Sequence, residues 1–349
     1  MAGTDHLPPA LAAFLAGGHG GPPRMEVNVA LPDLRPWQGG NVLPGVWSFA
    51  AEAPGPHVAV MAATHGNEIG GAVMLDRWLR AGLRPVRGRL SLIFANLDAL
   101  FRFDPSDPTA SRFIDEDLNR LWDEETLSGG RRSCELRRAR ALRPILDTVD
   151  VLLDLHSMLW PSDPLMLTGR PARAAQLALR IGLPSLVVAD EGHAAGLRMI
   201  DYAPFADPAG TRTALLLEAG AHWEAATVAT MEVVAARLLR LAGTVAAEDP
   251  VLPPLPGGLP VPRLAEVTRT VTAETARFTF LRPFRGGHVV HERNTLIALD
   301  GEEEIRTPHD DCLLVMPSLR TMPGQTAVRL ARFVPGQGKG RPGGPTRAA

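Results

Sequence analysis

The sequence predicts an α/β fold, in which a mostly parallel mixed sheet carries helices on both faces, followed by a small all-β domain. Between residues 45 and 248, short apolar runs of strand length alternate with longer segments of helical periodicity. That alternation is typical of a sheet covered by helices on both sides. After a Pro/Gly-rich segment at 249–262, only short β-like runs follow and helical periodicity is absent, which predicts an all-β region.

The region 45–248 is expected to form one catalytic domain. Its expected strands cover residues 57–63, 89–95, 149–155, 185–189 and 211–217. Its expected helices cover residues 69–83, 135–146, 172–181 and 223–241, the second being broken near Pro144 because proline lacks the N–H that a helix interior needs. Residues 98–128 have no clear period, and a long irregular segment inside a compact domain is usually functional or disordered.

The remaining segments flank this domain. Residues 1–44 are expected to form a leader and the N-terminal edge, and residues 249–262 a stiff linker. The small β domain is expected at 263–335, with strands at 266–271, 277–281, 296–299, 312–316 and 327–333. The Gly/Pro-rich residues 336–349 are expected to be a disordered tail.

Composition excludes several classes of protein. The 349 residues carry 36 Lys+Arg and 38 Asp+Glu, so the net charge of -2 gives no electrostatic reason to expect nucleic acid or an anionic membrane as partner. No apolar run reaches membrane-spanning length, and the N-terminus lacks the features of a signal peptide. Cys134 and Cys312 are far apart, so we expect a reducing, cytoplasmic location. A homo-oligomer remains open.

His65 and Glu68 directly follow the apolar run at 57–63. An imidazole and a carboxylate at this spacing could bind one metal ion, and Gly66 between them would let the backbone turn sharply. The alternative is a helix start, with Thr64 or Asn67 as the cap and Glu68 in the first turn.

His156 follows the expected strand at 149–155. With His65 and Glu68 it would complete two histidines and one carboxylate, a set that leaves the fourth zinc position open for water. Asp154 lies two residues earlier, on the same side of the strand, and could orient the imidazole. A histidine at a strand end can also be a hydrogen-bonded core residue.

The irregular segment contains Arg112, Asn119 and Arg120. Two arginines and an asparagine can recognise a carboxylate and donate to an oxyanion, although a solvated charged loop has the same composition. Glu218 ends the apolar strand at 211–217. Burial there would raise the pKa of its carboxyl toward neutrality, which suits a general base, whereas the alternative is a cap of the next helix.

Taken together and in this order, the motifs resemble those of the succinylglutamate desuccinylase/aspartoacylase family, which are zinc amidohydrolases related to M14 carboxypeptidases. They are THGNE at 64–68, RFIDEDLNR at 112–120, DLHS at 154–157 and the strand-end Glu218. The resemblance covers roughly residues 45–245 and includes a trailing β domain. It implies a zinc carboxypeptidase-like fold and hydrolysis of the linear amide bond of a small N-acyl amino acid or related carboxylate.

The same resemblance implies residue roles. His65, Glu68 and His156 would bind one Zn²⁺ per chain. Glu218 would take a proton from the attacking water and pass it to the leaving amine. In the irregular segment, Arg112 would stabilise the oxyanion, and Asn119 and Arg120 would bind a substrate carboxylate.

Two departures concern the substrate. The family uses an extra arginine before the catalytic glutamate, and Arg212, the nearest one here, lies closer to Glu218 than the family pattern has it. The family also uses a tyrosine of the C-terminal domain, but the only tyrosine here is Tyr202. We therefore expect a substrate other than N-acetylaspartate or succinylglutamate, with Arg212 as a candidate contact.

Three other functions compete with this reading. The first is an M14-type metallocarboxypeptidase that acts on peptides or cell-wall fragments. The second is a zinc-binding module without activity, which would require an incomplete ligand set or a lost base. The third is a nucleic-acid-binding protein, which only a few basic residues such as Arg131 and Arg132 would support.

Overall fold

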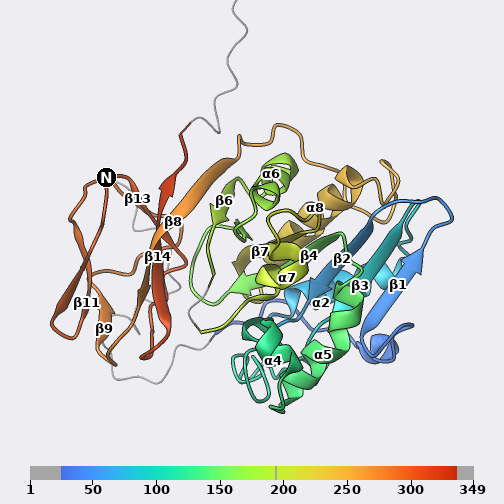
Figure 1. Ribbon diagram of the computed structural model, residues 1–349, viewed down its shortest axis with the longest axis horizontal. Coiled ribbons are helices and arrows are strands. Elements are labelled where there is room, and N and C mark those ends of the chain that lie inside the picture. The colour runs from blue at the N-terminus through green and yellow to red at the C-terminus, as the bar shows by residue number, and fades with distance from the viewer. Residues whose placement is uncertain (1–24, 193–194, 336–349) are drawn as a thin grey trace, which may run out of the picture.

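The computed structural model describes residues 25–192 and 195–335, so the expected tail and most of the expected leader lie outside the described residues. Within these residues, eleven strands form one sheet in the order β1-β3-β2-β4-β7-β5-β6-β8-β14-β13-β10, and three more form a second sheet in the order β12-β11-β9 (Figure 1). The sheet strands are β1 (Val46–Ala50), β2 (His57–Ala62), β3 (Arg89–Phe94), β4 (Val151–Met158), β5 (Leu165–Thr168), β6 (Leu186–Ala189), β7 (Thr213–Ala221), β8 (Arg263–Thr272), β9 (Phe278–Phe280), β10 (Val289–Val290), β11 (Leu296–Asp300), β12 (Glu303–Arg306), β13 (Cys312–Val315) and β14 (Thr326–Phe333).

The centre of the large sheet is parallel, as predicted. Strand β2 pairs in parallel with both β3 and β4, and β4 pairs in parallel with β7. Antiparallel pairing occurs between β1 and β3 and between β5 and β7, which makes the sheet mixed. The predicted fold class is therefore confirmed.

Helices cover both faces of this sheet (Figure 1). The helices are α2 (Gly70–Arg80), α3 (Leu97–Leu100), α4 (Glu124–Ser128), α5 (Cys134–Leu146), α6 (Ala172–Ile181), α7 (Ala203–Ala206) and α8 (Ala225–Leu241), with short 3-10 turns η1 (Arg35–Trp37), η2 (Leu118–Arg120) and η3 (Met199–Asp201). One apolar core contains residues of α2, α6 and α8, and the other contains residues of α4, α5 and α7. Alternate residues of β2 enter the two cores, because successive side chains of a strand point to opposite faces.

Several elements differ from the sequence-based expectation. Helix α5 continues through Pro144 to Leu146, because the proline lies in the last turn and buried apolar residues such as Leu142 and Leu146 anchor that end. Strands β4 and β7 run past the end of their apolar stretches, so His156 and Glu218 lie within strands and not after them. The short strands β1, β5, β10 and β12 were not predicted, because runs of two to five residues carry little periodic signal.

The large sheet passes without interruption from the expected catalytic region into the expected β region. Residues 251–262 contain no helix or strand, and β8, which follows them, pairs in parallel with β6. Strand β14 then pairs antiparallel with β8, so the C-terminal strands lie beside the catalytic region (Figure 1). This continuity lets a C-terminal strand contribute side chains to a site formed by the parallel strands.

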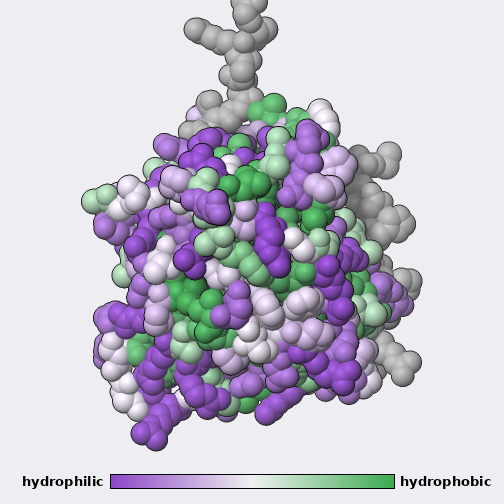
Figure 2. Space-filling model, turned by 90° about the vertical axis from the view of Figure 1, so that its right-hand side faces the viewer, coloured by the Kyte–Doolittle hydropathy of each residue, from purple (hydrophilic) through white to green (hydrophobic). Residues whose placement is uncertain are grey.

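One face of the molecule is mixed in its hydropathy. In the view of Figure 2, hydrophilic residues cover most of the visible face, and hydrophobic residues lie in small separate groups between them. Within residues 25–192 and 195–335, no helix combines the length and the apolarity needed to cross a bilayer.

Candidate metal centre and active site

A sharp turn after β2 carries His65 and Glu68. Ala63 adopts a left-handed backbone with φ of 55° directly after the strand. A Cβ on Gly66 would lie 2.4 Å from the backbone carbon of Ala99 and 2.5 Å from the carbonyl oxygen of Ser111. Glycine is therefore required at position 66 by close approach of the chain, and the left-handed residue of this turn is Ala63.

The helix-cap interpretation of this motif is wrong. Helix α2 begins at Gly70, no side chain caps its N-terminus, and no acidic residue lies in its first turn. The Thr64 hydroxyl instead donates to Asp154 Oδ1 over 2.8 Å. Thr64 thus links the turn after β2 to the neighbouring strand β4.

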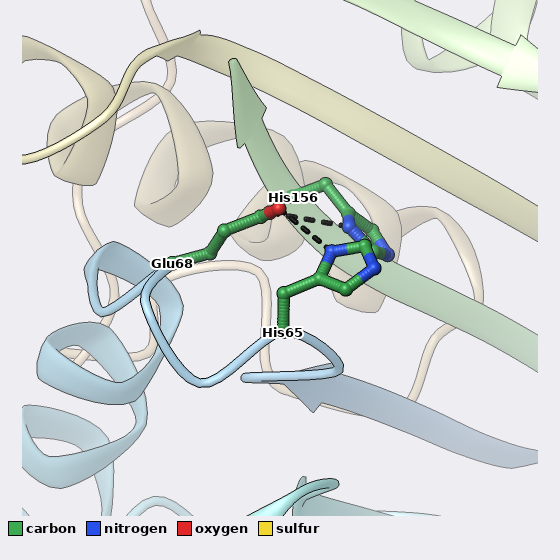
Figure 3. A group of neighbouring side chains, drawn as sticks. All are labelled: His65, Glu68 and His156. Atoms are coloured by element: carbon green, nitrogen blue, oxygen red, sulfur yellow. Dashed lines mark hydrogen bonds and ion pairs between the residues drawn. The ribbon is translucent and has the colours of Figure 1, made fainter. Parts of the chain in front are cut away.

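His65, Glu68 and His156 point toward one another in the protein interior (Figure 3). Glu68 Oε1 lies 2.7 Å from His65 Nδ1, and Glu68 Oε2 lies 3.2 Å from His156 Nδ1. One ligand atom of each residue lies within 4.8 Å of the ligand atoms of the other two. Among the described residues, these three form a group that could hold a metal ion. The predicted ligand set is therefore brought together by the fold.

The outer nitrogens of both imidazoles are bound by carboxylates. His65 Nε2 lies 2.9 Å from Asp117 Oδ1, and His156 Nε2 lies 2.8 Å from Asp154 Oδ2. His65 Nε2 also lies 2.9 Å from Arg112 Nη2. An imidazole whose outer nitrogen donates to a carboxylate, as His156 can to Asp154, presents Nδ1 to a metal. The donor chemistry, two imidazoles and a carboxylate with their orienting acids, fits a catalytic zinc ion.

The electrostatics show how closely these groups are coupled. Burial raises the pKa of the Glu68 carboxyl, but the charges and hydrogen bonds of His65 and His156 outweigh that effect and hold it well below its usual range. Burial lowers the pKa of His156, but Asp154 and Glu68 outweigh that effect and hold it well above its usual range. The buried carboxylates of Glu68 and Asp154 therefore favour a positive charge between them. A protonated His156 supplies that charge, and a metal cation would supply it as well.

Glu218 lies beside this group. It is the cross-strand partner of His156, is 6 % exposed, and its Oε2 has no hydrogen-bond partner among the described residues. Burial, helped by the nearby charge of Glu68, raises the pKa of its carboxyl to about 8. A carboxyl group with a pKa near neutrality can accept and return a proton at working pH.

Arg112 extends from the irregular segment to the ligand group. Its Nη2 lies 3.2 Å from Asp117 Oδ2, and its Nη1 lies 3.4 Å from Glu68 Oε1. The side chain keeps 39 % of its surface exposed, so it can reach a ligand from the open side. The segment itself is held by Glu135 of α5, a fully buried carboxylate that accepts the backbone N–H groups of residues 114, 115 and 116 and the amide of Asn96.

Asn119 and Arg120 lie one turn further along. Asn119 is buried and its Oδ1 accepts the backbone N–H of Met199 over 2.7 Å, which leaves its amide NH₂ group as the donor. Arg120 donates from Nη1 to the carbonyl of Asn119, and burial with the neighbouring charges of Arg112, Arg329 and Arg198 lowers its pKa despite Asp117.

Arg212 is not at the site, which corrects its assignment as a substrate contact. It precedes Thr213, which pairs with Val151 at the amino end of β4, whereas Glu218 pairs with His156 near the other end. Arg212 lies six residues before Glu218 along this extended segment, or about 20 Å at about 3.3 Å per residue. The backbone carbonyl of Arg212 accepts a hydrogen bond from Arg173.

Sequence reasoning missed several residues of the site. Asp117 is one of three acids in the RFIDEDLNR motif and has no distinguishing pattern of its own, and Glu135 resembles any acidic residue at a helix start. His222, which directly follows β7, is buried, with a pKa lowered to about 4 by burial, and its Nδ1 lies 2.7 Å from the hydroxyl of Ser157. These partners depend on contacts between distant parts of the chain, which periodicity does not reveal.

Comparison with known proteins adds independent information. Residues 54–242, more than half of the chain, match the succinylglutamate desuccinylase/aspartoacylase catalytic domain. The aspartoacylase of Rattus norvegicus is 32% identical over 121 residues, covering 32% of this chain and 36% of that protein. A probable aspartoacylase of Parasynechococcus marenigrum is 38% identical over 106 residues, covering 29% and 33%. The chain thus spans about a third of the length of the curated relatives it matches.

A solved structure shows the same fold over most of the chain. The succinylglutamate desuccinylase of Vibrio cholerae superposes with a TM-score of 0.62 at 19% identity, covering 83% of this chain and 86% of that one. At this identity, the likeness supports the fold, including the C-terminal strands.

Proposed function

The chain belongs to the succinylglutamate desuccinylase/aspartoacylase family, and from that premise we propose that it is a zinc-dependent amidohydrolase of small N-acyl amino acids or related carboxylates. The observation that supports this most is the position of Glu218. Its buried Oε2, which has no hydrogen-bond partner among the described residues, belongs to the cross-strand partner of His156, one of the three candidate metal ligands. A base next to a cation site is the arrangement that water-dependent amide cleavage requires.

We propose one zinc ion per chain, held by His65, Glu68 and His156. Asp117 and Asp154 support this assignment because each binds the outer nitrogen of one imidazole. When bound, zinc supplies Lewis acidity, which polarises the amide carbonyl and acidifies water.

Proton transfer is assigned to Glu218. As the carboxylate, it takes a proton from the attacking water, and as the acid it returns that proton to the nitrogen of the departing amine. Its raised pKa of about 8 supports the second step, because the protonated form is a usable acid near neutral pH. Next to a positive charge at the ligand group, the pKa of Glu218 would be lower, and its carboxylate form would then be available for the first step.

Arg112 is proposed to stabilise the charge that develops on the carbonyl oxygen. Its guanidinium carries permanent charge, and Asp117 and Glu68 hold it next to the candidate ligands. Asn119 and Arg120 are proposed to bind a carboxylate of the substrate, the first through its amide NH₂ and the second through the part of its guanidinium that Asn119 leaves free.

The proposed location is the cytoplasm, and the proposed partner is a small molecule. Cys134 and Cys312 are both free thiols, which agrees with a reducing compartment. The oligomeric state is open to measurement.

A substrate panel with metal analysis tests the function. The purified protein is assayed for bound zinc and for hydrolysis of N-acyl amino acids with varied acyl and amine parts, and of short peptides. We expect about one zinc per chain and release of amine from the N-acyl amino acids. Release of C-terminal residues from peptides without action on N-acyl amino acids would instead identify a carboxypeptidase.

The variant Glu218→Gln tests the mechanism. It keeps the size of the side chain but removes the base, so we expect kcat to fall about 10²- to 10⁴-fold with zinc retained. Glu302→Gln, on an exposed residue of the C-terminal region, is the matched control and should retain full activity. Full activity of Glu218→Gln would remove this residue from its role.

A further inference from the structure

Arg329 is a buried arginine on β14, a strand of the C-terminal region. Its side chain is only 8 % exposed, and its Nε donates to Asp190 Oδ2 over 2.8 Å. Asp190 directly follows β6, the strand that pairs with β8. Arg329 therefore joins the C-terminal strands to the loop that leaves the catalytic part of the sheet.

That loop touches the proposed substrate contacts. Met199 donates its backbone N–H to Asn119, and a Cβ on Gly196 would lie 2.2 Å from the carbonyl oxygen of Arg120. Val315, the cross-strand neighbour of Arg329 on β13, belongs to the same apolar core as Met199 and Leu118. Because opposite residues of an antiparallel pair share one face, Arg329 lies on the face of β14 that borders this core.

Contacts of Asp190 link Arg329 to the proposed substrate contacts. Asp190 Oδ2 accepts from Arg329 Nε over 2.8 Å and from Arg198 Nη1 over 2.9 Å, and Arg198 directly precedes Met199. The positive charge of Arg329 is also among the causes that lower the pKa of Arg120. Arg329 is therefore bound to the loop that contacts Asn119 and Arg120.

The hydrogen-bonding capacity of Arg329 is only partly used. Asp190 and Asp201 occupy Nε, Nη1 and Nη2 of the adjacent Arg198, which makes Arg198 a structural residue. In Arg329 only Nε is engaged, and both Nη atoms have no hydrogen-bond partner within residues 25–192 and 195–335. A buried guanidinium with two unused parallel donors matches a carboxylate, which accepts from such a fork in bidentate fashion.

We propose that Arg329 contacts the substrate and, together with Arg120, binds its carboxylate. The C-terminal β region would then complete the substrate site and select N-acyl compounds with a free carboxylate over those with a neutral carboxamide in its place. This inference rests on the proposed amidohydrolase function, because it assigns the group that recognises that substrate. Asp190 has the role of a positioning residue, since it holds Nε and aims the fork.

The test compares an acid with its neutral analogue. For the best substrate of the panel, kcat/KM is measured on the carboxylate and on the matching carboxamide, with wild type, Arg329→Gln, Arg329→Lys and Arg332→Gln. Arg332 lies on the same strand but is exposed, so its variant is the matched control. Zinc content and circular dichroism are recorded for each protein.

The expected result is a change in selectivity. In Arg329→Gln, kcat/KM for the acid should fall about 10- to 100-fold, mainly through KM, because hydrogen bonds to charged groups are lost. The carboxamide should change less than about 3-fold, because it does not need the cation. Arg329→Lys, which keeps the charge without the fork, should lie between wild type and Arg329→Gln, and Arg332→Gln should match wild type.

Two outcomes would overturn the inference. An equal loss for acid and amide in Arg329→Gln means that Arg329 only supports the fold. If that variant does not fold, an unchanged acid-to-amide ratio in folded Arg329→Lys has the same meaning.

Failure of the proposed function is recognised separately. In that case neither the wild-type protein nor any variant at position 329 hydrolyses the N-acyl bond, in the carboxylate substrates or in the matching carboxamides. Binding of the panel carboxylates, measured by calorimetry, then decides on Arg329, and equal affinity in wild type and Arg329→Gln would overturn the inference.

Discussion

Replacing Asp154 by asparagine should weaken metal binding without changing the fold. Asp154 is fully buried, with Oδ2 at 2.8 Å from His156 Nε2 and Oδ1 at 2.8 Å from the Thr64 hydroxyl. Asparagine has the same shape and can keep both contacts, because the hydroxyl of Thr64 can accept from the new amide as well as donate. The substitution therefore removes mainly the negative charge that orients and polarises His156.

The size of the effect follows from this burial. Loss of an acid that orients a metal-binding histidine typically costs about 10- to 100-fold in affinity, or about 1.4 to 2.8 kcal/mol at about 1.4 kcal/mol per tenfold. Asp154 is unexposed and its negative charge is unscreened by water, so we expect the upper half of this range. Asp117→Asn should fall in the lower half, because Asp117 is 19 % exposed and Arg112 already compensates its charge.

The assay measures zinc affinity and needs no substrate. Metal-free protein competes with a chromophoric chelator at fixed pH, and the affinity of Asp154→Asn is compared with that of wild type. Asp163→Asn is the control, because Asp163 follows the same strand but is exposed and pairs with Arg285 at the surface. Wild-type affinity in folded Asp154→Asn, or an equal loss in Asp163→Asn, would refute the reasoning.

Three further predictions concern stability. The pKa of Glu218 is raised to about 8 in the folded chain, so between its ordinary pKa and 8 the folded chain holds a proton that the unfolded chain has released. The metal-free protein should therefore lose stability as the pH rises through this window. Glu218→Gln should remove that part of the pH dependence, measured from urea unfolding curves at about pH 5 to 9. Glu135→Ala should lower the free energy of unfolding, measured by denaturant titration, by about 3 kcal/mol or more, because four N–H donors lose a buried acceptor. A loss below about 1 kcal/mol would show that residues 114–116 do not depend on Glu135. Gly66→Ala should reduce soluble yield and melting temperature strongly, because the new Cβ would approach Ala99 and Ser111 to about 2.5 Å, whereas Gly82→Ala, a left-handed position with open space, should show only the smaller backbone penalty.

The local pattern of the chain predicts the strands and helices that build the centre of the sheet. Long elements such as α6 and α8 were placed within two residues of their observed bounds, because an amphipathic period over ten or more residues is a strong signal. The segment 98–128 showed no period, and the structure gives the reason. It forms short turns whose shape depends on Glu135 and on contact with the loop after β6, and not on its own propensity.

Arg212 shows how proximity in sequence can mislead. It lies six residues before Glu218, but those residues form an extended strand and therefore separate the two side chains along β7. Arg329 lies more than a hundred residues after Glu218, yet the pairing of β6, β8 and β14 brings it to Asp190, at the start of the loop that contacts Asn119 and Arg120.

Local patterns of the chain are enough to predict the fold class, the family resemblance and the candidate ligands His65, Glu68 and His156, because apolar runs followed by polar motifs are local features. The folded arrangement alone shows which carboxylates orient those histidines, which acid holds the segment around Arg112, and which loop Arg329 binds. These depend on strand register and on contacts between segments far apart in the chain. Such contacts are made by packing and charge compensation in the folded state, so the periodicity and spacing of residues in the sequence do not predict them.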